Sequence, residues 1–342
     1  MTGMTANPVA RSLCAFLRIL PASTRILAGL VAAVALLGQA QAQPAWPAKP
    51  IRIIVPFAAG AFTDIAARTV AIELSTQLGQ PVLVENRGGA GSTLGTDAVA
   101  KAAPDGYTLV VTDNSFVISP SVYTKLPYDP LKDLAPISLI AETPAIWTVR
   151  ADLPARSVSE LVALARANPG MLTFGSGGVG SSAHLATQLF LDQNKIEMTH
   201  VPFKGVAAAL AEAAAGRIDV TVSSTGGAIP HIRSSRLRAL ALTGGARDAQ
   251  LADVPTFAEA GFPNYRMVYW FMLAAPTGTP PAVITRLYQE VVRATQATRV
   301  REAFAAAAAR PVSTPPAELA KRLEEEIATW KAVVVKAGVK PE

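Results

Sequence analysis

The chain has 342 residues, of which 50% are hydrophobic and 16% are charged, and its formal net charge is +6. This composition supplies enough apolar side chains for packed cores, and it excludes an intrinsically disordered or fibrous protein. The length predicts about two domains.

Residues 1–42 have the layout of a secretory signal peptide. Three arginines and no acidic residue form a basic end, residues 26–37 form an apolar core, and small residues flank a cleavage site after Ala42. The apolar core is too short to cross a bilayer, which takes about 20 residues. Because no polar face recurs at helical spacing, a buried amphipathic helix fits poorly. We therefore expect cleavage near Ala42 and a secreted mature protein.

Removal of this segment changes the classes of function that the sequence allows. The formal charge falls to +3, and Cys14, the only cysteine, is lost. The smaller charge takes away the main argument for nucleic-acid binding. A mature chain without cysteine has no thiol nucleophile, no disulfide and no cysteine-ligated metal.

Apolar runs bounded by turn residues alternate with helical patterns, which is typical of an α/β fold with largely parallel strands. The first series predicts strands at 51–55, 81–85 and 107–112, a helix opened by Thr63 and stopped by Gly79, and a helix ending before Pro104. A second series begins at Ser157, which forms a capping box with Glu160. Its strands are predicted at 171–174, 198–201, 218–222 and 237–242.

Two extended apolar passages, 136–149 and 267–275, connect these series. Two further helices follow, with prolines in their first turns at Pro281 and Pro316, and the second is expected to end at Gly338. This order predicts two lobes joined by two crossovers, with a cleft between them. Lobe 1 is expected to comprise 43–144 plus 265–342, and lobe 2 to comprise 145–264.

Four loops follow predicted strands, at the edge where open α/β sheets bind ligands: 56–64, 112–115, 175–184 and 202–205. In the first and third loops, glycine and hydroxyl residues run directly into a helix. The free N–H groups and the positive dipole end of such a helix attract anions, carboxylates in particular. Each loop taken alone is also explained as an ordinary capped turn. Two such loops, one in each lobe, indicate a carboxylate site.

The sequence offers little for catalysis. It has no nucleophile elbow, no phosphate loop and no metalloprotease motif, and its three histidines are widely separated. Ser182 and His184 stand too close on one helix start to pair readily as nucleophile and base. We expect no enzyme activity, no catalytic residue, no metal and no cofactor. A periplasmic serine hydrolase using Ser181 or Ser182 with His184 remains an alternative.

Six ordered segments carry a resemblance to a known family: 49–57, 84–87, 103–109, 126–130, 200–205 and 253–261. With them the chain resembles the solute-binding proteins of the tripartite tricarboxylate transporter family, the Bug receptors, over nearly all of the mature sequence. The resemblance implies a type II periplasmic-binding-protein fold in which two α/β lobes close over a small carboxylate. It also implies delivery of that ligand to the membrane subunits of a transporter. A sensor subunit that presents its closed form to a signalling receptor fits the same sequence.

The resemblance places the ligand against the loops that follow the first strand of each lobe. Carried onto this chain, the implied positions are Ala59, Gly60, Phe62, Thr63 and Asp64 in lobe 1, and Gly180, Ser181, Ser182 and Ala183 in lobe 2. To these we add candidates from the same and neighbouring loops: Phe57, Asn114, Ser115, His184, Phe203, Lys204 and Ser224. Lys204 is as readily a solvated loop lysine as an anion partner, and His184 is either structural or in contact with the ligand.

Two departures from the family pattern bear on the ligand. Gly60 is followed by Ala61 and Phe62, where the family has a second glycine and a small hydroxyl residue, so the pocket is narrower and gains a ring. Residues 223–225 are Ser-Ser-Thr where many relatives place Asp or Asn, so a partner for an ammonium group is missing. We therefore expect a monomer that binds a carboxylate without an amine, with aromatic and hydrophobic acids included.

Overall fold

The computed structural model describes residues 46–336. The chain divides into two compact units, residues 1–48 and 49–342, and the description below concerns the second. The predicted signal peptide, residues 1–42, and the predicted helix end at Gly338 lie outside the described residues.

The first half of the sheet contains β1 (Ile51–Val55), β2 (Val82–Asn86) and β3 (Thr108–Asp113). Strand β1 lies between β2 and β3 and is parallel to both. Helix α3 (Phe62–Leu78) connects β1 to β2, and η1 (Ala90–Ser92) and α4 (Thr93–Ala100) connect β2 to β3. Helix α3 ends as predicted, because Gly79 adopts φ 66° and its N–H bonds to the Ser75 carbonyl at 3.1 Å.

The second half repeats this arrangement. It contains α6 (Val158–Ala167), β5 (Thr173–Ser176), α7 (Ser182–Asn194), β6 (Thr199–Pro202), α8 (Val206–Ala214), β7 (Val220–Ser224), α9 (Thr225–Arg233), β8 (Leu237–Leu242) and η2 (Ala249–Leu251). Strand β5 lies between β6 and β7 and is parallel to both. The predicted cap of α6 is confirmed, since the Ser157 hydroxyl accepts the Glu160 N–H at 3.1 Å.

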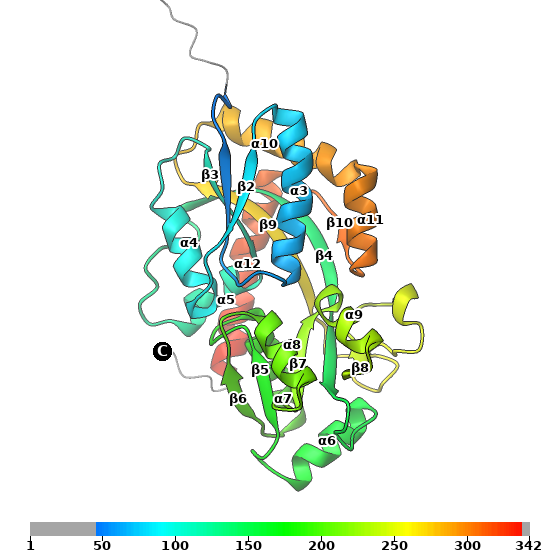
Figure 1. Cartoon of the computed structure of the whole chain (residues 1–342). Coiled ribbons are helices and arrows are strands. Elements are labelled where there is room, and N and C mark those ends of the chain that lie inside the picture. The colour runs from blue at the N-terminus through cyan, green and yellow to red at the C-terminus, as the bar shows by residue number, and fades with distance from the viewer. Residues whose placement is uncertain (1–45, 337–342) are drawn as a thin grey trace, which may run out of the picture. The chain divides into compact units, whose positions relative to one another are not determined.

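Two antiparallel strands, β4 (Leu134–Arg150) and β9 (Val268–Pro276), join the halves, where the sequence predicted extended crossovers. The first part of β4 pairs with β9, and its residues 145–149 pair with β7. Within residues 49–336, ten strands form one mixed sheet in the order β2-β1-β3-β9-β4-β7-β5-β6, with β8 and β10 (Arg310–Pro311) on β4 (Figure 1). The lobe boundaries proposed above stay a prediction.

The remaining helices are α5 (Ser115–Val122), α10 (Pro281–Gln296), α11 (Thr298–Ala306) and α12 (Pro316–Lys336). Helices α10 and α12 begin at the predicted prolines. Helix α10 packs on α3, whereas α12 packs on α5 and β4. In the described part of the chain, no helix combines the length and the apolar character needed to cross a membrane.

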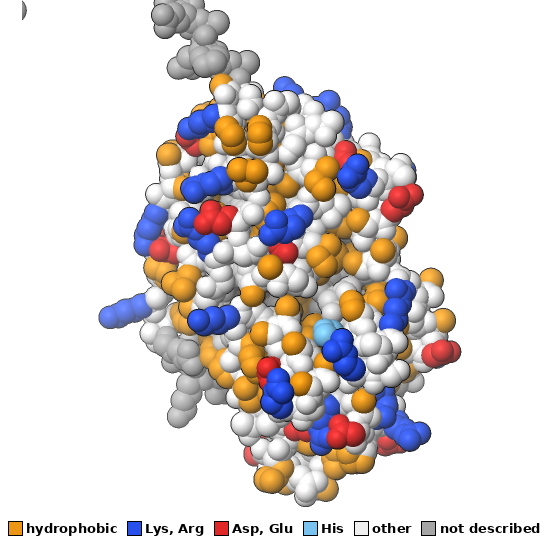
Figure 2. Space-filling view, in the orientation of Figure 1, with side chains coloured by type: hydrophobic (Ala, Val, Ile, Leu, Met, Phe, Trp, Pro, Cys, Tyr) orange, Lys and Arg blue, Asp and Glu red, His pale blue; other side chains and the backbone are white. Residues whose placement is uncertain are grey.

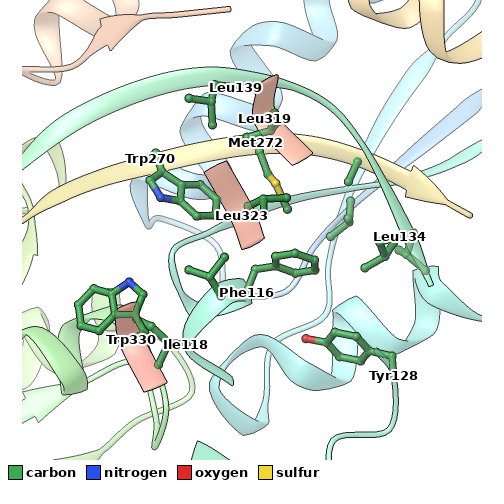
Figure 3. Close-up of a cluster of buried hydrophobic side chains, with 14 of the residues drawn as sticks. Phe116, Ile118, Tyr128, Leu134, Leu139, Trp270, Met272, Leu319, Leu323 and Trp330 are labelled. Carbon is green, nitrogen blue, oxygen red and sulfur yellow. The ribbon is translucent and has the colours of Figure 1, made fainter. Parts of the chain in front are cut away.

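A hydrophobic cluster fixes α5 and α12 against the first half of the sheet (Figure 3). Phe116 of α5, Met272 of β9 and Leu323 of α12 are each at most 2% exposed. At the edge of this cluster, Trp270 Nε1 donates to Glu326 of α12 at 2.8 Å. The C-terminal helix therefore packs beside residues that lie far from it in the sequence.

We expect Leu323→Ala to lower the free energy of unfolding by about 2–5 kcal/mol, because it leaves a cavity in this cluster. Leu94→Ala is the matched control, since Leu94 is also helical but is 60% exposed. Urea unfolding of both variants checks the expectation. Equal losses of stability would show that α12 is not held by this cluster.

Candidate functional site

A cavity of about 30 Å³ lies where the two halves of the sheet meet. Its lining residues are Phe57, Ala61, Phe62, Thr63, Asp113, Gly177, Ser181, Ser182, Ala183, Val206, Ser224, Tyr269 and Phe271. Most of them follow the carboxyl ends of β1, β3, β5, β6 and β7. Open α/β sheets generally bind ligands at this edge, which makes the cavity the candidate site.

Four helices begin at the cavity. Phe62 and Thr63 open α3, Ser182 and Ala183 open α7, Val206 opens α8, and Ser224 is the residue before α9. The first N–H groups of a helix have no acceptor within the helix, and the helix dipole adds positive potential at that end. Four such ends around one small space make a site for an anion.

Hydrogen bonds use some of the amides at the start of α7. The Ser182 N–H donates to Ser115 Oγ at 3.0 Å, and the His184 N–H donates to Ser181 Oγ at 3.3 Å. In the described part of the chain the Ala183 N–H has no such partner, and the same holds for the N–H groups of Phe62 and Thr63. These three residues line the cavity, so their amides are the candidate donors to a carboxylate.

The lining contains no Lys or Arg and one acid, Asp113. Its side chain is 7% exposed, accepts the Ser115 N–H at 2.9 Å and accepts the Ser182 hydroxyl at 3.3 Å. Burial raises the pKa of Asp113, and the hydrogen bonds from Ser115 and Ser182 oppose this rise. The positive potential at the cavity therefore comes from the backbone and not from charged side chains.

The other cavity walls are aromatic. Phe62 packs edge-on against Phe271 with ring centroids 4.9 Å apart, so the ring expected to narrow the pocket does line it. Tyr269 is 3% exposed, and its hydroxyl has no hydrogen-bond partner among the described residues. Burial, then the nearby Tyr265 and Asp113, raise the pKa of Tyr269 well above its ordinary value, and the smaller opposing effect of the nearby Ser182 hydroxyl does not reverse this, so the Tyr269 hydroxyl keeps its proton.

Several residues proposed from the sequence come together at this cavity: Phe57, Phe62, Thr63, Ser181, Ser182, Ala183 and Ser224. Ser115 lies directly behind them, because its hydroxyl accepts the Ser182 N–H. These residues come from loops that are far apart in the chain. The structure brings them together at the carboxyl ends of the strands, and their role in ligand binding stays a prediction.

The other proposed residues lie outside the lining. Ala59 and Gly60 are exposed, and Asp64 bonds to Arg68, Asn86 and the Gly60 N–H. Asn114 joins β3 to β9 by bonding to the backbone of Val268 and Trp270. The N–H of Gly180 donates to His184 Nδ1. Phe203 and Lys204 line a separate hollow of about 460 Å³, beside Gly91 and Val179.

Sequence reasoning missed Asp113, Tyr269 and Phe271. Asp113 ends β3 and stands opposite Phe271 on the neighbouring strand β9, so the two share a face of the sheet. Tyr269 is two residues from Phe271 and therefore lies on the same face. The segment 267–275 is continuously apolar, so the sequence does not distinguish its two faces, and only the pairing of β3 with β9 shows which face meets the cavity.

The observed side chains do not form the catalytic site of a serine hydrolase, the alternative given above. Ser182 Oγ donates to Asp113, and Ser181 Oγ accepts a backbone N–H. Among residues 46–336 neither hydroxyl bonds to a histidine ring. The hydrogen bond between a serine hydroxyl and a histidine ring in that part of the chain joins Ser176 to His200 at 2.6 Å, away from the cavity lining. No group of three or more potential metal ligands occurs in the same region.

The two halves of the molecule touch directly along a seam beside the cavity. The Tyr123 hydroxyl donates to the Val179 carbonyl at 2.7 Å. Gly91, with φ 56°, lies so close that a Cβ added there would overlap the same carbonyl oxygen. The seam thus depends on backbone-to-backbone approach. Elsewhere on the face shown in Figure 2, Lys and Arg side chains are interspersed with Asp and Glu and do not gather over one element.

We expect Gly91→Ala to hold the two halves apart, because its methyl group and the Val179 carbonyl cannot occupy the same space. Gly79→Ala is the matched control, since Gly79 also has positive φ but has open space around its Cβ position. Both variants should lose about 1–2 kcal/mol of stability through the strained backbone. Only Gly91→Ala should increase the radius of gyration measured by small-angle X-ray scattering. Equal radii of gyration for the two variants would show that close approach at Gly91 does not hold the two halves together.

His184 and His200 form a stacked pair with ring centroids 4.0 Å apart and planes 10° apart. Phe174 stacks on the outer face of His200 at 4.8 Å. Burial, and then the neighbouring His200, lowers the pKa of His184 to about 3, while burial lowers that of His200 to about 4. Both rings are therefore neutral near pH 7, and His184 has a structural role.

These pKa values are lower in the folded protein than in the unfolded chain. The pair's contribution to the free energy of unfolding is therefore fully present above about pH 6.5. The contribution is lost as the pH falls from there toward 4. We expect unfolding measurements to show a loss of about 1–3 kcal/mol between about pH 7 and 5. The loss should shrink clearly in His200→Gln and less in the comparison variant His231→Gln, because burial and Arg236 lower the pKa of His231 as well, but without a stacked histidine partner. An unchanged loss in His200→Gln would overturn the assignment.

Comparisons with known proteins agree with this geometry. The family model for the tripartite tricarboxylate transporter family receptor matches residues 66–339. Protein BugT of Bordetella pertussis is 38% identical over 321 residues, covering 93% of this chain and 98% of BugT.

Solved structures agree as well. Periplasmic binding protein BugD is 30% identical with a TM-score of 0.83, covering 87% of this chain and 100% of BugD. The R. palustris protein Rpa4515 with adipate is 34% identical with a TM-score of 0.83, over 87% of this chain and 100% of its own. MatC from Rhodopseudomonas palustris with bound malate is 33% identical with a TM-score of 0.81, over 84% and 100%. This chain therefore has the periplasmic-binding-protein fold and belongs to the tripartite tricarboxylate transporter family receptors, the Bug proteins.

Proposed function

We propose that this protein is a periplasmic receptor that captures a small organic carboxylate and delivers it to the membrane subunits of a tripartite tricarboxylate transporter. The observation that carries the proposal is the convergence of four helix N-termini on one cavity whose lining has no Lys or Arg. Relatives of this fold hold adipate and malate, which are small carboxylates. The basic and apolar segments of residues 1–42 support export to the periplasm.

Binding is the whole of the proposed chemistry. A carboxylate accepts hydrogen bonds from the amides of Phe62 and Thr63 on one side and of Ala183 on the other. Because these amides belong to the two proposed lobes, 43–144 plus 265–342 and 145–264, a bound ligand favours their approach. The lobes turn about β4 and β9, and the transporter recognises the closed form of the monomer.

The small volume of the cavity supports a site whose two lobes separate to admit the ligand. A volume of about 30 Å³ accommodates about two water molecules. An acid of several carbon atoms needs the seam between Gly91 and Val179 to separate, and then to close again around it. Ligand binding and lobe movement are therefore one coupled equilibrium.

Asp113 alters the expectation about an amine on the ligand. The Ser-Ser-Thr sequence at 223–225 removes one candidate partner for an ammonium group, but Asp113 brings a different acid into the cavity lining. The missing acid at 223–225 therefore no longer argues by itself against an amino acid. The positive potential of the helix ends still disfavours an ammonium group, so we keep the proposal of a carboxylate without an amine.

We expect thermal-shift measurements with succinate, adipate, malate, benzoate, aspartate and glutamate to show stabilisation by a subset of these acids. A ligand at about 100 times its dissociation constant contributes roughly 2.7 kcal/mol, enough for a shift of several degrees. No shift with any acid, including ones found in relatives, would count against the proposal.

Ala183→Asp and Ala183→Asn test the helix ends directly. The two side chains have nearly the same shape, so they reduce the cavity equally, and an acid in a first helical turn is compatible with folding. The aspartate adds like charge beside the bound carboxylate, which costs several kcal/mol. We expect calorimetry to show binding to Ala183→Asp at least about tenfold weaker than to Ala183→Asn. Equal affinities would show that the carboxylate does not lie at this helix end.

A further inference from the structure

Tyr269 brings an unused hydrogen-bonding group into the cavity. The side chain lines the cavity and is 3% exposed. Within residues 46–336 its hydroxyl makes no hydrogen bond of normal geometry, and the nearby Ser182 hydroxyl already donates to Asp113. A buried hydroxyl without a partner destabilises the protein, and such groups are rare in native structures. A phenol can donate one hydrogen bond and can also accept one. This hydroxyl is therefore available to a ligand.

Asp113 brings the complementary group to the same face of the sheet. It stands opposite Phe271 on the adjacent strand, and Phe271 is two residues from Tyr269 along β9. One carboxylate oxygen accepts the Ser115 N–H, and the other accepts the Ser182 hydroxyl. Because each oxygen has a second lone pair, the carboxylate can accept one more hydrogen bond from a ligand.

Few chemical groups satisfy both side chains at once. An ammonium group donates to Asp113, but it has no lone pair for the Tyr269 proton and lies among positive helix ends. A second carboxylate accepts from Tyr269 and places like charge beside Asp113. An alkyl group satisfies neither. A hydroxyl group donates to Asp113 and accepts from Tyr269, so both buried groups gain a partner.

We infer that the ligand carries a hydroxyl group close to its carboxylate and that Asp113 and Tyr269 bind this hydroxyl. The inference rests on the proposed function, because the carboxylate itself is assigned to the helix N-termini. The small cavity places both polar ends of the ligand within the same space. The substrate class is therefore a 2-hydroxy or 3-hydroxy acid, and Asp113 and Tyr269 determine specificity within the carboxylates.

The test uses three acids with one carbon skeleton and different groups at carbon 2: malate with a hydroxyl, succinate with hydrogen and aspartate with an ammonium group. Both enantiomers of malate and aspartate are titrated into the full chain by calorimetry. We expect one enantiomer of malate to bind about tenfold to a hundredfold more tightly than succinate and aspartate, because the deoxy acid leaves buried polar groups unpaired. In Tyr269→Phe the ratio of malate to succinate affinity should fall toward one, with succinate affinity nearly unchanged.

Tyr265→Phe is the matched control. Tyr265 is also buried, but its hydroxyl bonds to Trp147 Nε1 and to the Ala186 carbonyl, and it does not line the cavity. This variant should lower the thermal midpoint and keep the malate-to-succinate ratio. Tyr269→Phe should change the midpoint less than Tyr265→Phe does, since the Tyr269 hydroxyl makes no hydrogen bond of normal geometry to the described residues.

The outcomes separate the two levels of inference. If the acids bind without preference for malate, if aspartate binds best, or if Tyr269→Phe leaves the ratio unchanged, the hydroxyl assignment is wrong and the carboxylate receptor stands. If lactate also binds more tightly than propionate, and if Tyr269→Phe removes this difference, the substrate class extends to monocarboxylates. If none of these acids binds but adipate, benzoate or glutamate does, the hydroxyl assignment is wrong and the carboxylate receptor stands. If no acid of either panel binds, the proposed function fails together with the hydroxyl assignment.

Discussion

Strand β4 is the constraint on which the rest of the structure depends. It pairs with β9 in the first half of the sheet and with β7 and β8 in the second, so one continuous strand belongs to both halves. Within each half of the sheet, the strands that are parallel to one another direct their carboxyl ends to the same region, where their loops line one cavity. A shared strand also explains why the seam can form, because the two halves are already tethered beside it.

In the proposed site, one set of groups attracts the carboxylate and another selects among different carboxylates. Four helix ends attract any small anion, and they do so without a charged side chain that would need to lose its water on burial. Backbone amides are held in place by the helices, so they do not have to reorganise when a carboxylate arrives. In our proposal, discrimination between ligands falls to side chains of the cavity lining, namely Asp113, Tyr269 and the aromatic ring of Phe62.

Local sequence signals predicted most elements correctly, because each depends on neighbouring residues. Gly79 stops α3 through its left-handed conformation, Ser157 caps α6, and prolines open α10 and α12. The starts of β5, β6 and β7 were predicted slightly too early, since an apolar run continues into the preceding turn. Strand ends are set by hydrogen bonds to partner strands, and those partners are distant in the chain.

The candidate site likewise contains features that local sequence signals predict and features that depend on contacts between distant segments. The sequence by itself determined the α/β receptor family and the glycine- and hydroxyl-rich loops at helix starts, and it singled out Phe62, Thr63, Ser181, Ser182 and Ala183, which line the cavity. Only the tertiary structure decided that Asp113 and Tyr269 face the cavity, whereas Lys204 lines another hollow and His184 stacks on His200. The physical reason is that a helix start is fixed by local hydrogen bonds. The direction of a strand residue depends on register against strands that fold from elsewhere in the chain.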